Sequence, residues 1–296
     1  EYMKRRGKHI ISSTVEHDAI RKSLDELEKR GFEVTRLKPD ASGAIPVQSV
    51  VDALRDDTIL VSLMMVNNET GAVTDISAVS RELKRAGSQA LLHTDAVQGF
   101  MKVPFRAKTL GADMISISGH KIHAPKGIGA LYIRAGLKLK PFIVGGSQES
   151  GMRAGTEAMP QIAAFGAASE IAYAGMKENI ARMSALRERA VSRLERDIPE
   201  LRVISSADSA PHILSISLPG WRSEVLMNYL EARGVYVSRS SACKKGGRSH
   251  VLEAVGLDAK TIDGAIRVGL SRLTTEEDID ALCDALRDAH DTLAHR

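Results

Sequence analysis

One stretch decides the fold: Ser116-Ile117-Ser118-Gly119-His120-Lys121. It follows an apolar run, Ala112-Asp113-Met114-Ile115, which is typical of the end of a buried strand. A lysine just past a strand end can reach a site at the edge of a sheet. There it can form a Schiff base with an aldehyde cofactor, while the neighbouring serine and histidine hold the cofactor's phosphate. Taken alone, so short a motif more often contains a solvated lysine in a turn.

A second motif lies one strand earlier, at His93-Thr94-Asp95-Ala96-Val97-Gln98, and follows the apolar run Ala90-Leu91-Leu92. Pyridoxal phosphate (PLP) needs a carboxylate against its pyridine nitrogen, because the protonated ring withdraws electrons from the substrate's Cα. Asp95 stands at a strand end that suits this task. An isolated aspartate there is more often a helix or turn cap. Together with Lys121, the cofactor interpretation is favoured.

Apolar runs and amphipathic stretches alternate through the first half of the chain. We expect strands at residues 9–13, 32–37, 58–66, 90–95, 112–118 and 127–133, and helices at 18–30, 47–55 and 76–86. Such alternation predicts an α/β fold with a mainly parallel sheet covered by helices on both faces. Ligands of such sheets bind at the carboxyl ends of the strands, where Asn68, Asp95 and Lys121 all stand.

The second half of the chain predicts a smaller α+β domain. A helical pattern covers residues 161–196, and we place the domain boundary inside it, dividing the chain into 1–176 and 177–296. Beyond it we expect strands at 212–218, 235–238 and 265–270 and helices at 223–233 and 276–294. The large domain is expected to bind the cofactor, and the small domain carries a cysteine-containing loop.

The bulk properties narrow the class of protein. The chain has 296 residues, a formal net charge of +4 and basic residues interleaved with acidic ones, which is typical of solvated helix faces. No apolar run is long enough to span a bilayer. Its two cysteines, Cys243 and Cys283, are far apart and form no disulfide framework. We therefore expect a cytoplasmic protein that binds neither membrane nor nucleic acid.

The two motifs together resemble the NifS-like cysteine desulfurases, fold-type I PLP enzymes of the class V aminotransferase group. Further blocks agree in order and separation: Val15-Glu16-His17, Val66-Asn67-Asn68-Glu69-Thr70-Gly71, Gly151-Met152-Arg153-Ala154-Gly155-Thr156, Ser240-Ser241-Ala242-Cys243 and Ile266-Arg267-Val268-Gly269-Leu270-Ser271-Arg272. The resemblance implies a seven-stranded type of PLP-transferase sheet. It also implies that an N-terminal part of the family pattern is missing, including a turn whose threonine binds the PLP phosphate.

The resemblance assigns roles to the first two motifs. Lys121 is the residue that bonds PLP and later carries the Cα proton. Asp95 pairs with the pyridine nitrogen, and Gln98 forms a hydrogen bond with the ring O3′. Ser118 and His120 hold the phosphate, helped by backbone N–H groups. Lys126 is a second candidate cation, although a turn residue is the commoner interpretation of it.

Other blocks complete the implied site. His17 stacks on the cofactor ring and handles protons, although a helix-capping or surface histidine is commoner. Thr156 reaches the phosphate of the partner subunit in a homodimer, and its alternative is a simple turn hydroxyl. Arg267, in an apolar strand, binds the substrate carboxylate bidentately, and Asn68 contacts the same carboxylate or the cofactor. Arg272 is the alternative residue for binding the substrate carboxylate. We expect it to lie past the end of the strand and to form a structural pair instead.

Cys243 selects the reaction. Its surroundings, Arg239-Ser240-Ser241-Ala242-Cys243-Lys244-Lys245-Gly246-Gly247-Arg248, are small, polar and basic, which indicates an exposed loop and favours the thiolate. Cys283, on the apolar face of the last helix, fits the usual buried cysteine. A thiolate at Cys243 can take sulfur from bound cysteine as a persulfide. The pair Lys244-Lys245 departs from the small polar residues that the family more often has there.

These observations predict a PLP-dependent cysteine desulfurase that converts L-cysteine to L-alanine. The sulfur then passes to a protein acceptor, either an iron–sulfur scaffold or a sulfur carrier for thiolation of tRNA or cofactors. Two alternatives stay open. One is another class V PLP enzyme, such as a selenocysteine lyase or an aminotransferase. The other is an inactive fragment that keeps only the fold.

Overall fold

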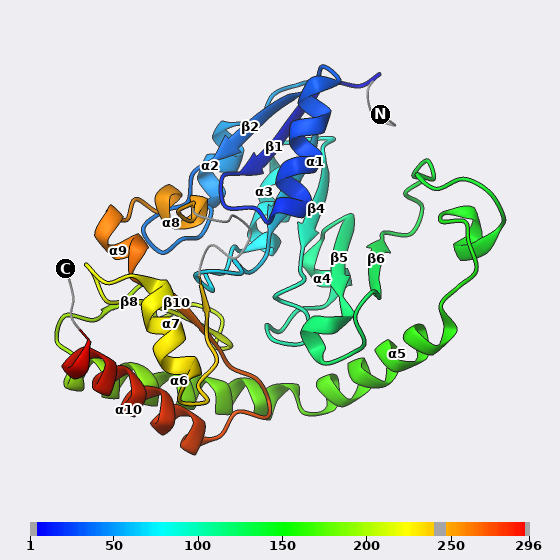
Figure 1. The fold of residues 1–296 in the computed structure, drawn as a ribbon. Coiled ribbons are helices and arrows are strands. Elements are labelled where there is room, and N and C mark those ends of the chain that lie inside the picture. Colours follow the sequence, from blue (N-terminus) through cyan, green and yellow to red (C-terminus); the bar gives the residue numbers. More distant parts are fainter. Residues whose placement is uncertain (1–4, 240–246, 294–296) are drawn as a thin grey trace.

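The computed structural model describes residues 5–239 and 247–293. A six-stranded sheet forms its first half, with the strands in the order β2-β1-β3-β4-β5-β6 (Figure 1). The first five strands pair in parallel, and β6 is antiparallel to β5. The strands are β1 (His9–Ser13), β2 (Glu33–Leu37), β3 (Thr58–Met64), β4 (Leu91–Asp95), β5 (Met114–Ser118) and β6 (Gly129–Ile133). The predicted α/β class is confirmed.

Helices cover both faces of this sheet because successive strand residues point to opposite sides. In β1, Ile10 packs in a cluster with Leu24 of α1 (Asp18–Lys29). Its neighbour Ile11 packs in the larger cluster on the other face. That cluster takes residues from α2 (Val47–Asp52), α3 (Ile76–Arg85) and α4 (Ala107–Leu110). Burying both faces fits the near-continuous apolar composition of the strands.

A second, antiparallel sheet in the order β7-β8-β10-β9 forms the C-terminal unit. Its core includes buried residues of the long helices α6 and α10, which pack against each other below the sheet in Figure 1. The elements are α6 (Met176–Asp197), β7 (Arg202–Val203), β8 (Ile213–Ser217), α7 (Ser223–Glu231), β9 (Ser238–Arg239), α8 (His250–Ala254), α9 (Ala259–Asp263), β10 (Ala265–Gly269) and α10 (Glu276–Thr292). This is the smaller α+β unit that the sequence predicts.

Two sequence expectations need correction in detail. The strand expected at 235–238 is only the two-residue β9, because it pairs with β10 solely through Ser238 and Arg239. The helical pattern at 161–196 is split into α5 (Met159–Ala174) and α6 at Gly175. This break lies close to the boundary expected between 176 and 177, and the division into two domains stays a prediction.

A buried turn after β3, residues 67–71, joins the two units. The Asn67 side chain builds it: its Oδ1 accepts the N–H groups of Glu69 and Thr70, at 2.9 and 3.0 Å. Residues of the C-terminal unit bind the backbone of the same turn. Ser205 Oγ donates to the Thr70 carbonyl at 2.6 Å, and the Ala210 N–H donates to the Gly71 carbonyl at 2.8 Å. The C-terminal unit is thereby fixed at the carboxyl edge of the parallel sheet.

Candidate active site

The carboxyl ends of the parallel strands meet at one edge, as the sequence predicts. Asp95 is the last residue of β4 and is buried, with 7% of its surface exposed. Its Oδ1 accepts the N–H of Val97 at 2.9 Å, and burial raises the pKa of its carboxyl group. A carboxylate held this way attracts a protonated ring nitrogen strongly, because little water screens the charge.

Lys121 lies in the short 3₁₀ turn η1 (Gly119–Ile122), directly after β5. The side chain is half-buried, and its pKa is lowered by burial and then by the positive charge of Arg267. Residues 146 positions apart in the chain therefore act on each other electrostatically across the two units. A lowered pKa favours the neutral amine, which is the nucleophilic form of a lysine.

Ser118 and His120 are brought together at the same strand end. Ser118 Oγ lies 2.8 Å from His120 Nδ1. Burial lowers the pKa of His120, and the neighbouring charges of Lys121, Lys126 and Lys102 lower it further. The three lysines make this corner of the edge positive, which suits a phosphate dianion.

Gln98 contacts a residue that the sequence did not single out. Its Oε1 lies 3.3 Å from Nε2 of His212, which comes from the start of β8 in the C-terminal unit. His212 is 3% exposed, and its Nδ1 has no partner among the described residues. Burial and the charges of Lys102, Lys121 and Arg267 hold its pKa well below the usual value. A neutral imidazole therefore orients the amide of Gln98.

His17 occupies the helix-capping position that the sequence offered as the commoner interpretation. It is the exposed N-cap of α1, and its Nδ1 accepts the N–H of Ala19 at 3.2 Å. It is also close enough to Asp95 to lower the pKa of that carboxyl group. The ring caps the helix, its charge acts on the Asp95 carboxylate, and its stacking on a cofactor stays a prediction.

Arg267 lies in β10, and its Nη1 donates to the backbone carbonyl of Asn68 at 2.6 Å. This contact carries the guanidinium from the C-terminal unit to the edge that holds Lys121. Arg272 lies past the end of β10, as expected, where its charge acts on His123. The structure therefore brings Arg267 to the edge, whereas Arg272 lies near the turn after Lys121.

Thr156 lies apart from these residues. It is exposed, in the segment between the short turn η2 (Gln148–Gly151) and α5. Figure 1 shows this segment extending away from the sheet. The structure of this single chain does not bring Thr156 to the edge with Lys121, so its role at a partner's site stays a prediction.

Cys243 falls outside the described residues, but both flanks of its segment are described. On one side, Ser238 of β9 pairs with Arg267 of β10. On the other, Ser249 Oγ donates to Oε2 of Glu69, and the Arg248 guanidinium binds the Asp263 carboxylate through two bonds of 2.8 Å. Arg248 thus has a carboxylate partner that offsets its charge, which the sequence did not reveal.

Lys102 is a further residue that sequence reasoning missed. The side chain is half-buried, and burial together with the charge of Lys121 lowers its pKa to about 8. Its charge also lowers the pKa values of His120 and His212. It follows Gln98 by four residues in a turn. Nothing in the local sequence indicates that a single lysine in a turn is buried near another lysine.

Glu16 is a second buried acid, and the charge of Asp95 acts on it. It is 1% exposed, and its Oε1 accepts Ser13 Oγ at 2.6 Å and the N–H of Met64 at 3.0 Å. Its Oε2 has no partner among the described residues. Burial, opposed by these two hydrogen bonds and helped by the charge of Asp95, raises the pKa of Glu16 from 4.5 to about 7.

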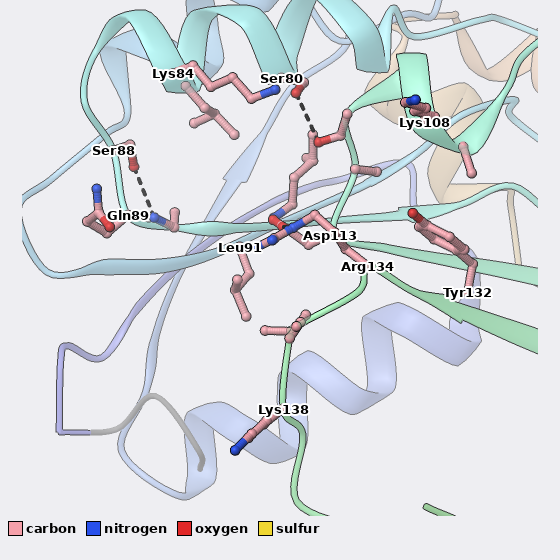
Figure 2. A pocket seen from close by; sticks show the side chains of 18 of the residues that line it. Ser80, Lys84, Ser88, Gln89, Leu91, Lys108, Asp113, Tyr132, Arg134 and Lys138 are labelled. Atoms are coloured by element: carbon pink, nitrogen blue, oxygen red, sulfur yellow. Dashed lines mark hydrogen bonds and ion pairs between the residues drawn. The ribbon is translucent and has the colours of Figure 1, made fainter. Parts of the chain in front are cut away.

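A cavity of about 930 Å³ lies elsewhere on the sheet. It is lined by Leu91 at the amino end of β4, by Asp113 before β5 and by Arg134 after β6 (Figure 2). Arg134 Nε donates to Asp113 Oδ1 at 2.6 Å. None of the predicted site residues that the structure describes lines it, and the cavity lies at the opposite end of the parallel strands from the candidate site. Within 5–239 and 247–293, no cluster of metal-ligating side chains occurs.

The raised pKa of Glu16 predicts a pH-dependent stability. The folded state binds the proton more tightly than the unfolded state, so stability is lost as pH rises from 4.5 to about 7. The Glu16→Gln variant cannot ionise there. Between pH 5 and pH 8 its free energy of unfolding should fall less than that of the wild type, by about 2–3 kcal/mol. Urea unfolding at both pH values measures this.

The exposed Glu178→Gln change on α6 serves as the control and should keep the wild-type pH dependence. A Glu16→Gln variant whose stability depends on pH as steeply as the wild type would show that Glu16 is ionised in the folded protein.

Comparison with known proteins gives the family. The pattern of the class-V aminotransferase family matches residues 1–282. Cysteine desulfurase 2 of Trichormus variabilis is 44% identical over 276 residues, which cover 92% of this chain and 69% of the relative. The cysteine desulfurase IscS of Methanosarcina thermophila is 39% identical over 284 residues, which cover 95% of this chain and 70% of the relative.

Solved structures agree with these sequence relatives. A NifS-like protein superposes with a TM-score of 0.92 at 35% identity, covering 99% of this chain and 77% of its own. DndA from Streptomyces lividans superposes with a TM-score of 0.76 at 36% identity, over 91% of this chain and 77% of its own. The chain belongs to the class-V aminotransferase family, within its NifS-like cysteine desulfurase group.

Proposed function

We propose that this protein is a PLP-dependent cysteine desulfurase, which converts L-cysteine to L-alanine and leaves the sulfur as a persulfide on Cys243. The observation that carries the proposal is the meeting of three elements at one edge. Lys121 follows β5, Asp95 ends β4, and Arg267 reaches the same edge from β10. Ser238, which pairs with Arg267, is five residues before Cys243.

The residues present fit PLP, the cofactor of this family. Asp95 is a buried carboxylate of raised pKa, which suits a protonated pyridine nitrogen. Ser118 and His120 lie within hydrogen-bond distance of each other among lysine charges, which suits a phosphate. Gln98, held against His212, would bind the ring oxygen. When bound, PLP would supply an electron sink that stabilises negative charge at the substrate's Cα.

The side chains of this chain then divide the work. Arg267 would bind the substrate carboxylate with its guanidinium fork, helped by Asn68, and so orient the Cα–H bond. Lys121 would take the Cα proton as a base, because its lowered pKa favours the neutral amine. His17, which is exposed and whose charge acts on Asp95, would move a proton to or from the substrate thiol.

The sulfur step needs no external oxidant. The Cys243 thiolate attacks the sulfur of bound cysteine, a new S–S bond forms, and the C–S bond breaks. Its electron pair stays with the carbon, which takes a proton and becomes the methyl group of alanine. The second cysteine is unsuited to this step. Cys283 is 1% exposed in the core, where burial raises the pKa of its thiol to about 11.

The two cysteines provide a matched test of the nucleophile. Cys243→Ala should lower the rate of alanine and sulfide formation from L-cysteine by several orders of magnitude, in an assay with a reductant present. Cys283→Ala should keep the rate within about threefold while lowering stability by about 1–2 kcal/mol, as expected for a small buried side chain. Normal turnover by Cys243→Ala would exclude it as the sulfur acceptor.

The same assay separates the rival functions. A selenocysteine lyase would release selenium from selenocysteine without Cys243, so the Cys243→Ala variant would keep that activity, whereas an aminotransferase would form neither alanine nor sulfide from L-cysteine even in the wild type. An inactive fragment would remain colourless after addition of PLP, whereas a protein that bonds PLP through Lys121 becomes yellow.

We further propose a homodimer in which Thr156 of one subunit completes the site of the other. The segment from β6 to α5 exposes large apolar side chains, including Phe142 at 96%, Val144 at 77% and Tyr173 at 64%. None of the residues of α5 is buried. Exposed apolar groups gathered on one segment favour an interface with a second copy.

The dimer can be tested by its mass in solution. Analytical ultracentrifugation should give about twice the 32.0 kDa of one chain. The double change Phe142→Asp with Val144→Asp should shift the protein to monomer, because buried carboxylates at an interface are strongly unfavourable. Leu273→Asp, at a position 64% exposed outside this segment, should leave the mass unchanged. A wild-type monomer would refute the proposal.

The sulfur acceptor is proposed to be a cytoplasmic protein, either an iron–sulfur scaffold or a sulfur carrier. Its support is the pair Lys244-Lys245 beside Cys243, since basic residues speed encounter with an acidic surface. Arg248 contributes less to this attraction because it is paired with Asp263. Within the described ranges no helix is long and apolar enough to cross a membrane.

Charge reversal tests the acceptor proposal. Lys244→Glu with Lys245→Glu should slow transfer of labelled sulfur to the acceptor, most strongly at low salt. The single-turnover formation of alanine should change little. If both rates fall equally, the lysines serve the chemistry at Cys243 rather than docking.

A further inference from the structure

Two adjacent residues of the turn at 67–71 contact the C-terminal unit close to the proposed reaction. One contacts Arg267, the proposed clamp for the substrate carboxylate, and the other contacts Ser249, which follows the segment of Cys243. The Asn68 carbonyl accepts Nη1 of Arg267 at 2.6 Å. The next residue, Glu69, accepts Oγ of Ser249 on its Oε2 at 2.5 Å. The turn thus holds the proposed carboxylate clamp by the backbone of Asn68, and its next residue carries a buried carboxylate on which the charge of Arg267 acts.

Glu69 is a buried acid in an unusual position. It is 5% exposed, and Ser249 is 2% exposed. Ser249 Oγ also accepts the N–H of Leu252 at 3.1 Å and so caps α8. The hydroxyl proton of Ser249 is therefore directed to Glu69, and the acid is held in place by a fixed donor. Among the described residues of the C-terminal unit, Arg267 supplies the positive charge that acts on Glu69.

Resting on the proposed function, we propose that Glu69 is a positioning residue that sets how strongly Arg267 holds the substrate carboxylate. The carboxylate of Glu69 and that of the substrate compete for the same guanidinium charge. When Glu69 is ionised, it offsets part of that charge and repels the incoming carboxylate. When Glu69 is protonated, the full charge of Arg267 is available to the substrate.

This competition takes place near neutral pH. Burial raises the pKa of Glu69 from 4.5 to about 7, against the opposing effects of the Ser249 hydrogen bond and the Arg267 charge. A substrate carboxylate on Arg267 offsets that charge, so it should raise the pKa of Glu69 further. Binding should therefore take up protons around pH 7, and the affinity should fall as pH rises through this range.

L-Alanine is a suitable probe, because it carries the substrate's carboxylate and amine but no thiol. Its binding to the PLP-loaded protein can be measured by calorimetry at pH 6 and pH 8. Between pH 6 and pH 8 the dissociation constant of the wild type should rise by about tenfold relative to that of Glu69→Gln, whose own pH dependence reports the groups that both proteins share, including the amine of L-alanine. The Glu69→Gln variant keeps an acceptor for Ser249 but no charge.

Glu69→Gln should therefore bind L-alanine about as tightly as the wild type at pH 6, where Glu69 is protonated, and about tenfold more tightly than the wild type at pH 8. Ser249→Ala gives a second, opposite readout. Loss of its hydrogen bond should raise the pKa of Glu69, so the change in affinity should move to higher pH. Both variants are checked for folding by thermal unfolding.

An identical pH dependence in the wild type and in Glu69→Gln would overturn the inference, as would binding that Arg267→Ala leaves unchanged. Should Glu69→Gln fail to fold, an unshifted profile in Ser249→Ala would overturn it instead. The proposed function is tested separately by alanine formation from L-cysteine in the wild type. A protein that desulfurates cysteine but shows no Glu69 effect refutes only the positioning role.

Discussion

The structure depends on the hydrogen bonds of one buried turn. Asn67 uses both ends of its amide: Nδ2 donates to the Val15 carbonyl at the end of β1, and Oδ1 accepts N–H groups of its own turn. The carbonyl groups left on the outside of the turn are then taken by Ser205, Ala210 and Arg267. Because buried backbone groups must be paired, the turn determines where the C-terminal unit sits. The position of Arg267 relative to Lys121 follows from this docking.

Burial of charge at this edge destabilises the fold and serves the chemistry. Desolvation raises the pKa values of Glu16, Glu69 and Asp95 and lowers those of Lys102 and Lys121. Groups whose pKa values move toward neutrality can exchange protons at physiological pH, which acid–base catalysis requires. The fold supplies the compensating stability from two large apolar cores, one within the C-terminal unit and one that joins the parallel sheet to Ala210, Ile213 and Val251 of that unit.

The sequence predicted the parts of the structure that local pattern controls. Strand ends followed by Asp95 and Lys121 could be recognised because apolar runs and turn residues bound them, and parallel strands bring such ends to one edge. Resemblance added Arg267 and Asn68, which the structure joins by a hydrogen bond. Chain order alone could not have shown that these two residues meet.

What the sequence could not predict depends on contacts between distant segments. Lys102 and His212 look like an ordinary turn lysine and a strand-start histidine, yet both are desolvated, and His212 meets Gln98 of the other unit. The pairing of Arg248 with Asp263 likewise depends on how α9 packs. The carboxyl groups of Glu16 and Glu69 are raised in pKa by burial that no local pattern indicates.

The central claim is that the carboxyl edge of the parallel sheet is a PLP site built around Lys121. Lys102 is the other lysine that could bond PLP, since both lysines lie at this edge and both have lowered pKa values. The protein would be incubated with PLP, reduced with borohydride and digested, and the pyridoxyl group located by peptide mass spectrometry. We predict that it is bonded to Lys121. Label on Lys102, or on neither lysine, would contradict the account.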